Sequence, residues 1–250
     1  MKRFVLVLTV TVAALSATAQ ESEFARVLIP VHTDELPGAN GSLWYSDIWL
    51  HANTDQGAWI LPQTVTDVGP YTHQTVRLSL YRAGAGQAPG QLILVTRAAL
   101  DDVQFNLRVR DLSRQGETWG TEVPVVPEHK FLAKPVALLP VPLGSGFRST
   151  VRVYGLEQTG GSVRVRVSSI ANDEAGGRGV LYDAVWHLAP TVSQFTPPYA
   201  EIPIYVILPA SPATARIDVE PVTPGFRFWA LASVTHNETQ HVTVISPQIP

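Results

Sequence analysis

Hydrophobic and polar residues alternate along most of the chain, and this two-residue period predicts β-strands. In residues 162–168, three valines occupy every second position, and serine or arginine fills the positions between them. Residues 105–110 alternate in the same way. Because successive side chains of a strand point to opposite faces, such segments have one buried and one solvated face. We therefore expect half-buried strands of antiparallel sheets.

Turn-forming residues separate the alternating segments. The chain contains 20 prolines and 18 glycines, and most of them fall between the predicted strands, as in 36–41, 88–90 and 223–225. Several short strands divided by such turns are typical of β-sandwiches. The predicted fold class is all-β.

The second half of the chain repeats the first. Val-Leu-Ile-Pro-Val at 27–31 recurs as Ala-Leu-Leu-Pro-Val at 137–141, and Phe105 and Phe226 each precede a Glu-Thr pair by twelve residues. A junction near 127–134 precedes the second copy. We therefore expect two tandem antiparallel β-sandwich domains of immunoglobulin-like or fibronectin-like character, over 22–128 and 134–250.

Strand alternation also predicts which side chains are buried. In the first copy the expected core contains Ile29, Trp44, Ile48, Leu50, Phe105 and Leu107. In the second copy it contains Leu139, Phe147, Val151, Val153, Val163, Val165, Phe226 and Phe228.

The first residues have the pattern of an export signal. Lys2 and Arg3 precede an apolar run over 4–14, and Ala-Thr-Ala at 17–19 supplies a small-residue cleavage site, so residues 1–19 are predicted to be a signal peptide. The alternative is a retained membrane anchor, but the run is shorter than the roughly 20 apolar residues of a spanning helix. The mature protein is expected to lack a membrane span and to be secreted or periplasmic in a bacterium.

Composition narrows the possible partners. With no cysteine, the chain can form no disulfide, and its net charge of −3 gives no bulk attraction for nucleic acid. Nucleic acid is therefore excluded as a partner, and no cofactor is expected. A polysaccharide or an envelope protein remains as the expected partner.

A resemblance supports export. Residues 37–44 read Pro-Gly-Ala-Asn-Gly-Ser-Leu-Trp and lead into Tyr45, Ser46 and Asp47, an apolar strand and Asn53. This pattern resembles one found in secreted bacterial β-rich proteins of uncharacterised function, and residues 228–243 are similar to the end of the same group. The resemblance implies an exported β-sandwich protein and supplies no catalytic or ligand-binding residue.

The clearest candidate site is one face of the strand predicted over 44–51. Alignment of Trp44 with Phe147 turns the even-numbered residues of this strand toward the core and leaves an outward set of Tyr45, Asp47, Trp49 and His51. Aromatic rings on a solvent face commonly mark a contact surface, and they stack on sugar rings. Asp47 and His51 would bond sugar hydroxyls. The alternative is that the second domain or a loop covers these rings.

Two further candidates lie in the second copy. Arg148, Arg152, Arg164 and Arg166 would form one patch for anionic ligands if their two strands shared a sheet, and the alternative is an ordinary solvated face. Asn172, Asp173 and Glu174 offer oxygen ligands for calcium, although a plain loop is the favoured explanation and no metal site is assigned.

Catalytic motifs are absent from the sequence. It contains no Gly-x-Ser-x-Gly elbow, no cysteine nucleophile and no His-Glu-x-x-His run. Asp47, Glu174 and Glu201 would serve a glycosidase only if two of them met at the right separation in space. We expect a non-catalytic binding or structural protein, with carbohydrate as the leading ligand, protein assembly as the first alternative and a secreted glycoside hydrolase as the second.

Overall fold

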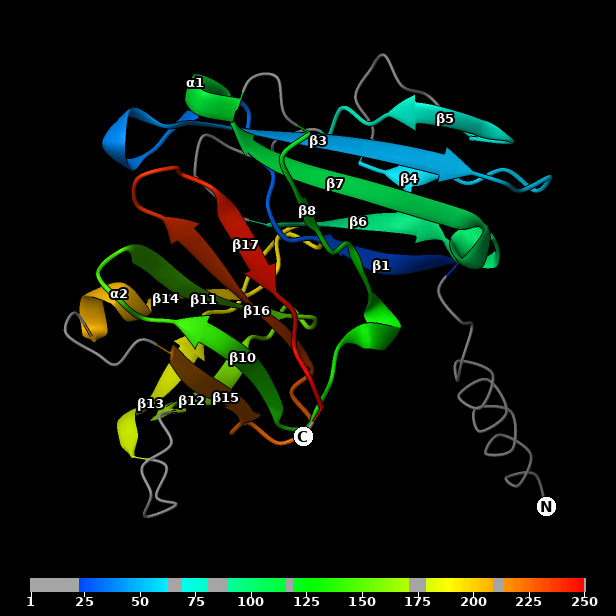
Figure 1. Cartoon of the computed structure of the whole chain (residues 1–250). Coiled ribbons are helices and arrows are strands. Elements are labelled where there is room, and N and C mark those ends of the chain that lie inside the picture. Colours follow the sequence, from blue (N-terminus) through cyan, green and yellow to red (C-terminus); the bar gives the residue numbers. More distant parts are fainter. Residues whose placement is uncertain are drawn as a thin grey trace, which may run out of the picture.

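The computed structural model describes residues 23–62, 69–80, 90–115, 119–170, 179–208 and 214–249. These residues form antiparallel β-sheets joined by turns and a few short helices, which confirms the all-β prediction (Figure 1). The predicted signal peptide at 1–19 and the calcium candidate Asn172, Asp173 and Glu174 lie outside the described residues. Within the described ranges, no helix is long and apolar enough to cross a membrane.

Strands from residues 24–127, here called the first half, form two of the four sheets. The inner sheet has the order β4-β6-β1-β9, with β1 at Phe24–Ile29, β4 at Ile60–Leu61, β6 at Gln91–Thr96 and β9 at Val126–Pro127. The outer sheet has the order β2-β3-β7-β8 with β5 also paired to β3, and its strands are β2 at Leu36–Pro37, β3 at Leu43–Ala52, β5 at Gln74–Arg77, β7 at Val103–Asp111 and β8 at Thr121–Val123.

Strands from residues 136–245, here called the second half, form the other two sheets. The inner sheet has the order β14-β11-β16-β17, with β11 at Phe147–Gly155, β14 at Tyr199–Pro203, β16 at Phe228–His236 and β17 at Val242–Ile245. The outer sheet has the order β10-β15-β12-β13, with β10 at Val136–Pro142, β12 at Gly161–Ser169, β13 at Val180–Leu188 and β15 at Thr214–Pro221. The short helices are η1 at Ala39–Gly41, η2 at Arg97–Asp102, α1 at Leu112–Gln115, η3 at Glu128–Lys130 and α2 at Ile204–Ile207.

The two halves share their strand pairings. In the first half β1 pairs with β6, β3 pairs with β7, and β7 pairs with β8. In the second half β10 pairs with β15, β11 with β16, and β16 with β17, in the same order along the chain. An additional strand also flanks β3 and β11, namely β5 and β14.

Each half encloses its own hydrophobic core between its inner and outer sheets. Among the predicted core residues, those that are buried are Ile29, Ile48, Leu50, Leu107, Val151, Val153, Val163, Val165, Phe226 and Phe228. Trp44, Phe105 and Phe147 are partly buried against the same two cores. The alternation of the sequence therefore identifies the inward face of these strands correctly.

The prediction that Leu139 belongs to the second core is wrong. The pairing of β10 with β15 shifts register between Leu138 and Val141, and both of these residues are fully buried in the core. Leu139 is only half-buried and does not belong to the cluster. Because an irregularity in a ladder changes which side chains face inward, alignment with Ile29 selects the wrong leucine.

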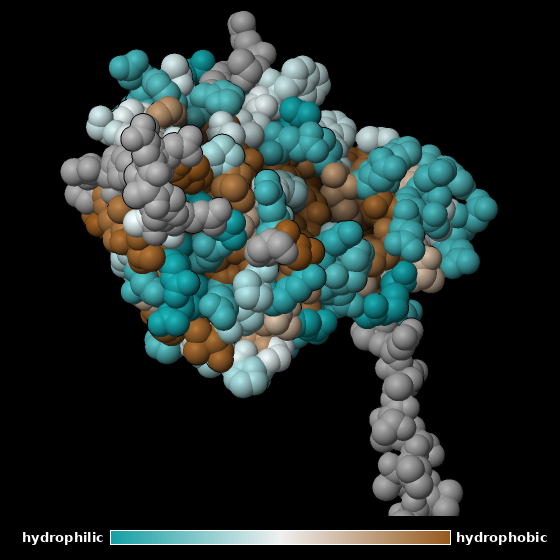
Figure 2. Space-filling view, turned by 60° about the horizontal axis from the view of Figure 1, so that its bottom comes forward, coloured by the Kyte–Doolittle hydropathy of each residue, from teal (hydrophilic) through white to brown (hydrophobic). Residues whose placement is uncertain are grey.

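A third apolar cluster joins the two halves. Leu28 and Leu92 from the inner sheet of the first half meet Tyr154, Trp229 and Leu231 from the inner sheet of the second half. The layers therefore follow one another as outer sheet, inner sheet, inner sheet and outer sheet (Figure 1). A view from the side of the second half shows hydrophobic residues reaching the surface in patches among hydrophilic ones (Figure 2).

Candidate functional site

The outward face of β3 carries the four residues that the sequence singles out, and we call this set the β3 face. Trp49 and His51 are exposed, whereas Tyr45 and Asp47 are half-buried. The even-numbered residues between them, such as Ile48, are buried in the core. The second half packs on the inner sheet, on the other side of this sandwich, so it does not cover Trp49, whose exposed fraction is 39%.

Two arginines cover the ring of Tyr45. The Cζ atom of Arg77 lies 5.5 Å from the ring centroid, and the Cζ atom of Arg110 lies 5.8 Å from it. These are cation–π distances. Because β5 carries Arg77 and β7 carries Arg110, the contacts come from the strands on either side of β3. Tyr45 is therefore engaged within the sheet, and Trp49 is the open ring of the β3 face.

Neighbouring strands also hold the polar members of the β3 face. Asp47 Oδ1 accepts a hydrogen bond of 2.7 Å from Arg77 Nε. The ring Nδ1 of His51 lies 2.8 Å from the hydroxyl of Thr75. Trp49 itself lies opposite Arg77 on β5 and opposite Asn106 on β7. The result is one exposed indole ring among polar groups whose positions are fixed by the sheet.

The predicted patch of four arginines does not form. Arg148 and Arg152 lie on β11 in the inner sheet, whereas Arg164 and Arg166 lie on β12 in the outer sheet. The condition that the two strands share a sheet is therefore not met. Arg164 and Arg166 both form ion pairs with Asp183. Its Oδ1 lies 2.9 Å from Arg164 Nε, and its Oδ2 lies 3.2 Å from Arg166 Nη2.

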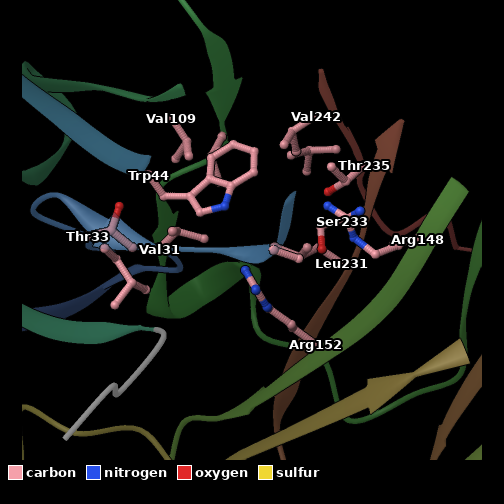
Figure 3. A pocket seen from close by; sticks show the side chains of 14 residues that line it. Val31, Thr33, Trp44, Val109, Arg148, Arg152, Leu231, Ser233, Thr235 and Val242 are labelled. Carbon is pink, nitrogen blue, oxygen red and sulfur yellow. The ribbon is translucent and has the colours of Figure 1, made fainter. Parts of the chain in front are cut away.

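Arg148 and Arg152 instead line a cavity between the two halves, which we call the central cavity (Figure 3). Its volume is about 230 Å³. The residues around it are Val31, Thr33, Leu36, Ala39, Trp44, Val109, Val123, Arg148, Arg152, Leu231, Ser233, Thr235, Val242 and Val244. The walls are thus mostly apolar and come from both halves of the chain.

Sequence reasoning did not find the central cavity. It considers Arg148 and Arg152 only as part of an anion-binding or solvated face, yet Tyr154, on the same face of β11, is fully buried. The signal that could have revealed it lies in β16, where Trp229 and Leu231 alternate with core residues, so that the strand is apolar on both faces. A strand of that kind is covered on both faces.

The guanidinium groups of the two cavity arginines differ in their hydrogen-bond partners. Arg148 donates from Nη1 to Asn237 Oδ1 at 2.8 Å and from Nη2 to Gln240 Oε1 at 2.7 Å. Arg152 has a buried Nε without a hydrogen-bond partner within the described chain, and Glu201 Oε2 lies 3.7 Å from it. Glu201 is also held by the hydroxyl of Tyr199. Burial and this bond to Glu201 raise the pKa of Tyr199, so it stays protonated at neutral pH.

The carboxylates considered for hydrolysis are not brought together. Asp47 lies on the outer sheet of the first half beside Arg77, whereas Glu201 lies on β14 in the second half. Glu174 lies outside the described residues. Over the same described part of the chain, no group of three or more histidine, aspartate or glutamate side chains is placed to hold a metal ion.

Comparisons with protein-family models, with curated proteins and with solved structures find no match to this chain. The functional argument therefore depends on the chemistry of the β3 face and of the central cavity.

Proposed function

We propose that this chain is an exported, non-catalytic binding protein of bacteria, made of two immunoglobulin-like β-sandwich domains at 22–128 and 134–250. The two separate cores and the repeated strand pairings support this division. The pattern of residues 1–19 supports export. The proposed site is the β3 face, and the proposed ligand is a polysaccharide.

The proposal depends chiefly on the exposure of Trp49. Trp49 is 39% exposed, and the other members of its sheet face are Tyr45, Asp47 and His51. A sugar ring has an apolar face of C–H groups that packs on an aromatic ring and an edge of hydroxyls that needs hydrogen-bond partners. Asp47 accepts hydrogen bonds, and Asn106 and His51 accept or donate them. Because the sheet already holds these groups in place, binding would lose little side-chain conformational entropy.

A binding panel tests this function. The mature protein is incubated with immobilised bacterial and plant polysaccharides and with cell-wall material. Trp49→Ala is compared with Trp59→Ala, because Trp59 is 40% exposed and so offers an indole of the same accessibility elsewhere. We expect retention on at least one polysaccharide that is lost in Trp49→Ala and kept in Trp59→Ala. Equal retention of all three proteins, or no retention on any material, would reject the β3 face as a glycan site.

A further inference from the structure

The central cavity is a second feature that the β3 face does not explain. It lies between the inner sheet of the second half and residues of the first half's core, among them Val109 and Val123 from the inward face of the outer sheet. An apolar cavity of about 150 Å³ is large enough to hold benzene. The volume here, about 230 Å³, is therefore sufficient for a small organic molecule.

Arg152 gives this apolar space a charged end. Figure 3 shows its side chain extending from β11 toward Val31 and Leu231. The side chain is 21% exposed, and its Nε has no hydrogen-bond partner among the described residues. A guanidinium group has five donors and keeps its charge in proteins. Glu201 lies 3.7 Å from Nε and the side chain of Tyr199 hydrogen-bonds to the same group, so a ligand anion would share the guanidinium with them.

The remaining polar groups are consistent with an anionic ligand that has an apolar body. Ser233 and Thr235 supply hydroxyl groups to the wall from β16, next to Arg148 (Figure 3). Arg148 adds positive charge, although its Nη1 and Nη2 already donate to Asn237 and Gln240. The residues that line the cavity include no carboxylate, although Glu201 pairs with Arg152 at the charged end. Valine, leucine and tryptophan side chains make up most of the rest.

We propose that the central cavity binds a small carboxylate with an apolar body, such as a medium-chain fatty acid, and that Arg152 pairs with its carboxylate group. A guanidinium and a carboxylate form two parallel hydrogen bonds, which fixes the orientation of the ligand. The apolar chain then lies against Trp44 and the valines of the cavity. This site is independent of the polysaccharide proposed for the β3 face.

Calorimetric titration of the mature protein with decanoate tests the proposal. Decan-1-ol is the matched probe without a charge, and Arg152→Gln is the matched variant without a guanidinium. Arg164→Gln serves as the control variant, because Arg164 is an arginine of the same half that is paired with Asp183 on the outer sheet. We expect saturable decanoate binding that is about 10-fold or more weaker in Arg152→Gln and for decan-1-ol, and unchanged in Arg164→Gln.

Two further measurements keep the test decisive. Thermal unfolding of each variant shows whether it is folded, and Arg152→Lys retains a charge in case Arg152→Gln does not fold. Arg152→Lys is expected to bind decanoate more weakly than the unsubstituted protein and still to prefer it over decan-1-ol. Equal affinity for decanoate and decan-1-ol, or no binding of either, overturns the proposal. Binding of a peptide with a C-terminal leucine, without binding of decanoate, also overturns the proposal, because the cavity would then recognise the C-terminus of a polypeptide.

Discussion

The hydroxyl group of Tyr154 donates a hydrogen bond of 2.6 Å to the backbone carbonyl oxygen of Pro30, across the boundary between the two halves. The Tyr154 ring is fully buried, with its centroid 5.5 Å from that of Tyr199 and 6.4 Å from that of Trp229. Burial raises the pKa of Tyr154, so the hydroxyl remains a donor at any physiological pH. This contact links the inner sheet of the second half to the segment that follows β1 in the first half.

Removal of that hydroxyl tests its contribution. Tyr154→Phe keeps the ring packing but leaves the carbonyl oxygen of Pro30 without this donor, which costs about 1–3 kcal/mol for a buried group. For a chain of this size, the loss corresponds to a melting temperature lower by about 2–4 °C per kcal/mol. Tyr205→Phe is the control, because Tyr205 is exposed. Equal melting temperatures for the two variants, measured by calorimetry, would contradict the role of this bond.

Gly90 allows Tyr154 to approach the first half closely. A Cβ atom at Gly90 would lie 2.6 Å from Cε1 of Tyr154 and 3.2 Å from the carbonyl oxygen of Ile29. Because the Tyr154 ring is buried and cannot move aside, Gly90→Ala is expected to destabilise the protein by about 1–3 kcal/mol. Gly144→Ala is a matched control, since a Cβ there meets nothing within 4 Å. The free energies of unfolding of the two variants are measured in urea. Equal values would show that the residues around Gly90 rearrange to accommodate a Cβ atom at little cost.

Asp111 is the buried carboxylate that organises one end of the outer sheet of the first half. It accepts hydrogen bonds from the backbone N–H groups of Leu43 and Ser113, from the Ser113 hydroxyl, and from Arg114. Burial alone would raise the pKa of Asp111, but these donors outweigh it and hold the pKa below its ordinary value. The ionised form of Asp111 therefore stabilises the folded state.

The sign of this shift predicts acid sensitivity. A carboxylate with a lowered pKa in the folded state contributes stability above its unfolded pKa of about 4, and this stability is lost as the pH falls toward the folded value. We expect the free energy of unfolding to decrease below pH 4. Asp111→Asn should lower stability at pH 7 by about 1–3 kcal/mol and flatten the decrease below pH 4. Parallel pH profiles for the two proteins in urea unfolding would show that Asp111 does not carry the effect.

Export makes a prediction about the mature chain. If residues 1–19 are a signal peptide, expression in a bacterium should give a product that begins at Gln20, as measured by the intact mass. Ala19→Phe should block this cleavage, because the position before the cut requires a small residue. A full-length protein that keeps residues 1–19 and is found in the membrane fraction would instead indicate a membrane anchor.

Alternation in the sequence predicts the buried faces of β3 and β11 because each strand keeps a strict two-residue period. It cannot predict what covers the opposite faces, since this depends on how separate sheets pack. The sequence leaves open whether the second half covers the rings of Tyr45 and Trp49. The ring that is covered between the halves is instead that of Tyr154, which aligns with His51. Neither can alternation show that consecutive strands such as β11 and β12 belong to different sheets.

The most direct test of the proposed function is a fluorescence titration. The intrinsic tryptophan emission of residues 20–250 is followed as soluble polysaccharides are added, in parallel with Trp49→Ala and Trp59→Ala. We predict a saturable change in emission with one of the polysaccharides that disappears in Trp49→Ala and persists in Trp59→Ala. No change with any polysaccharide, or a change that survives in Trp49→Ala, would contradict the assignment of the β3 face as a glycan-binding site.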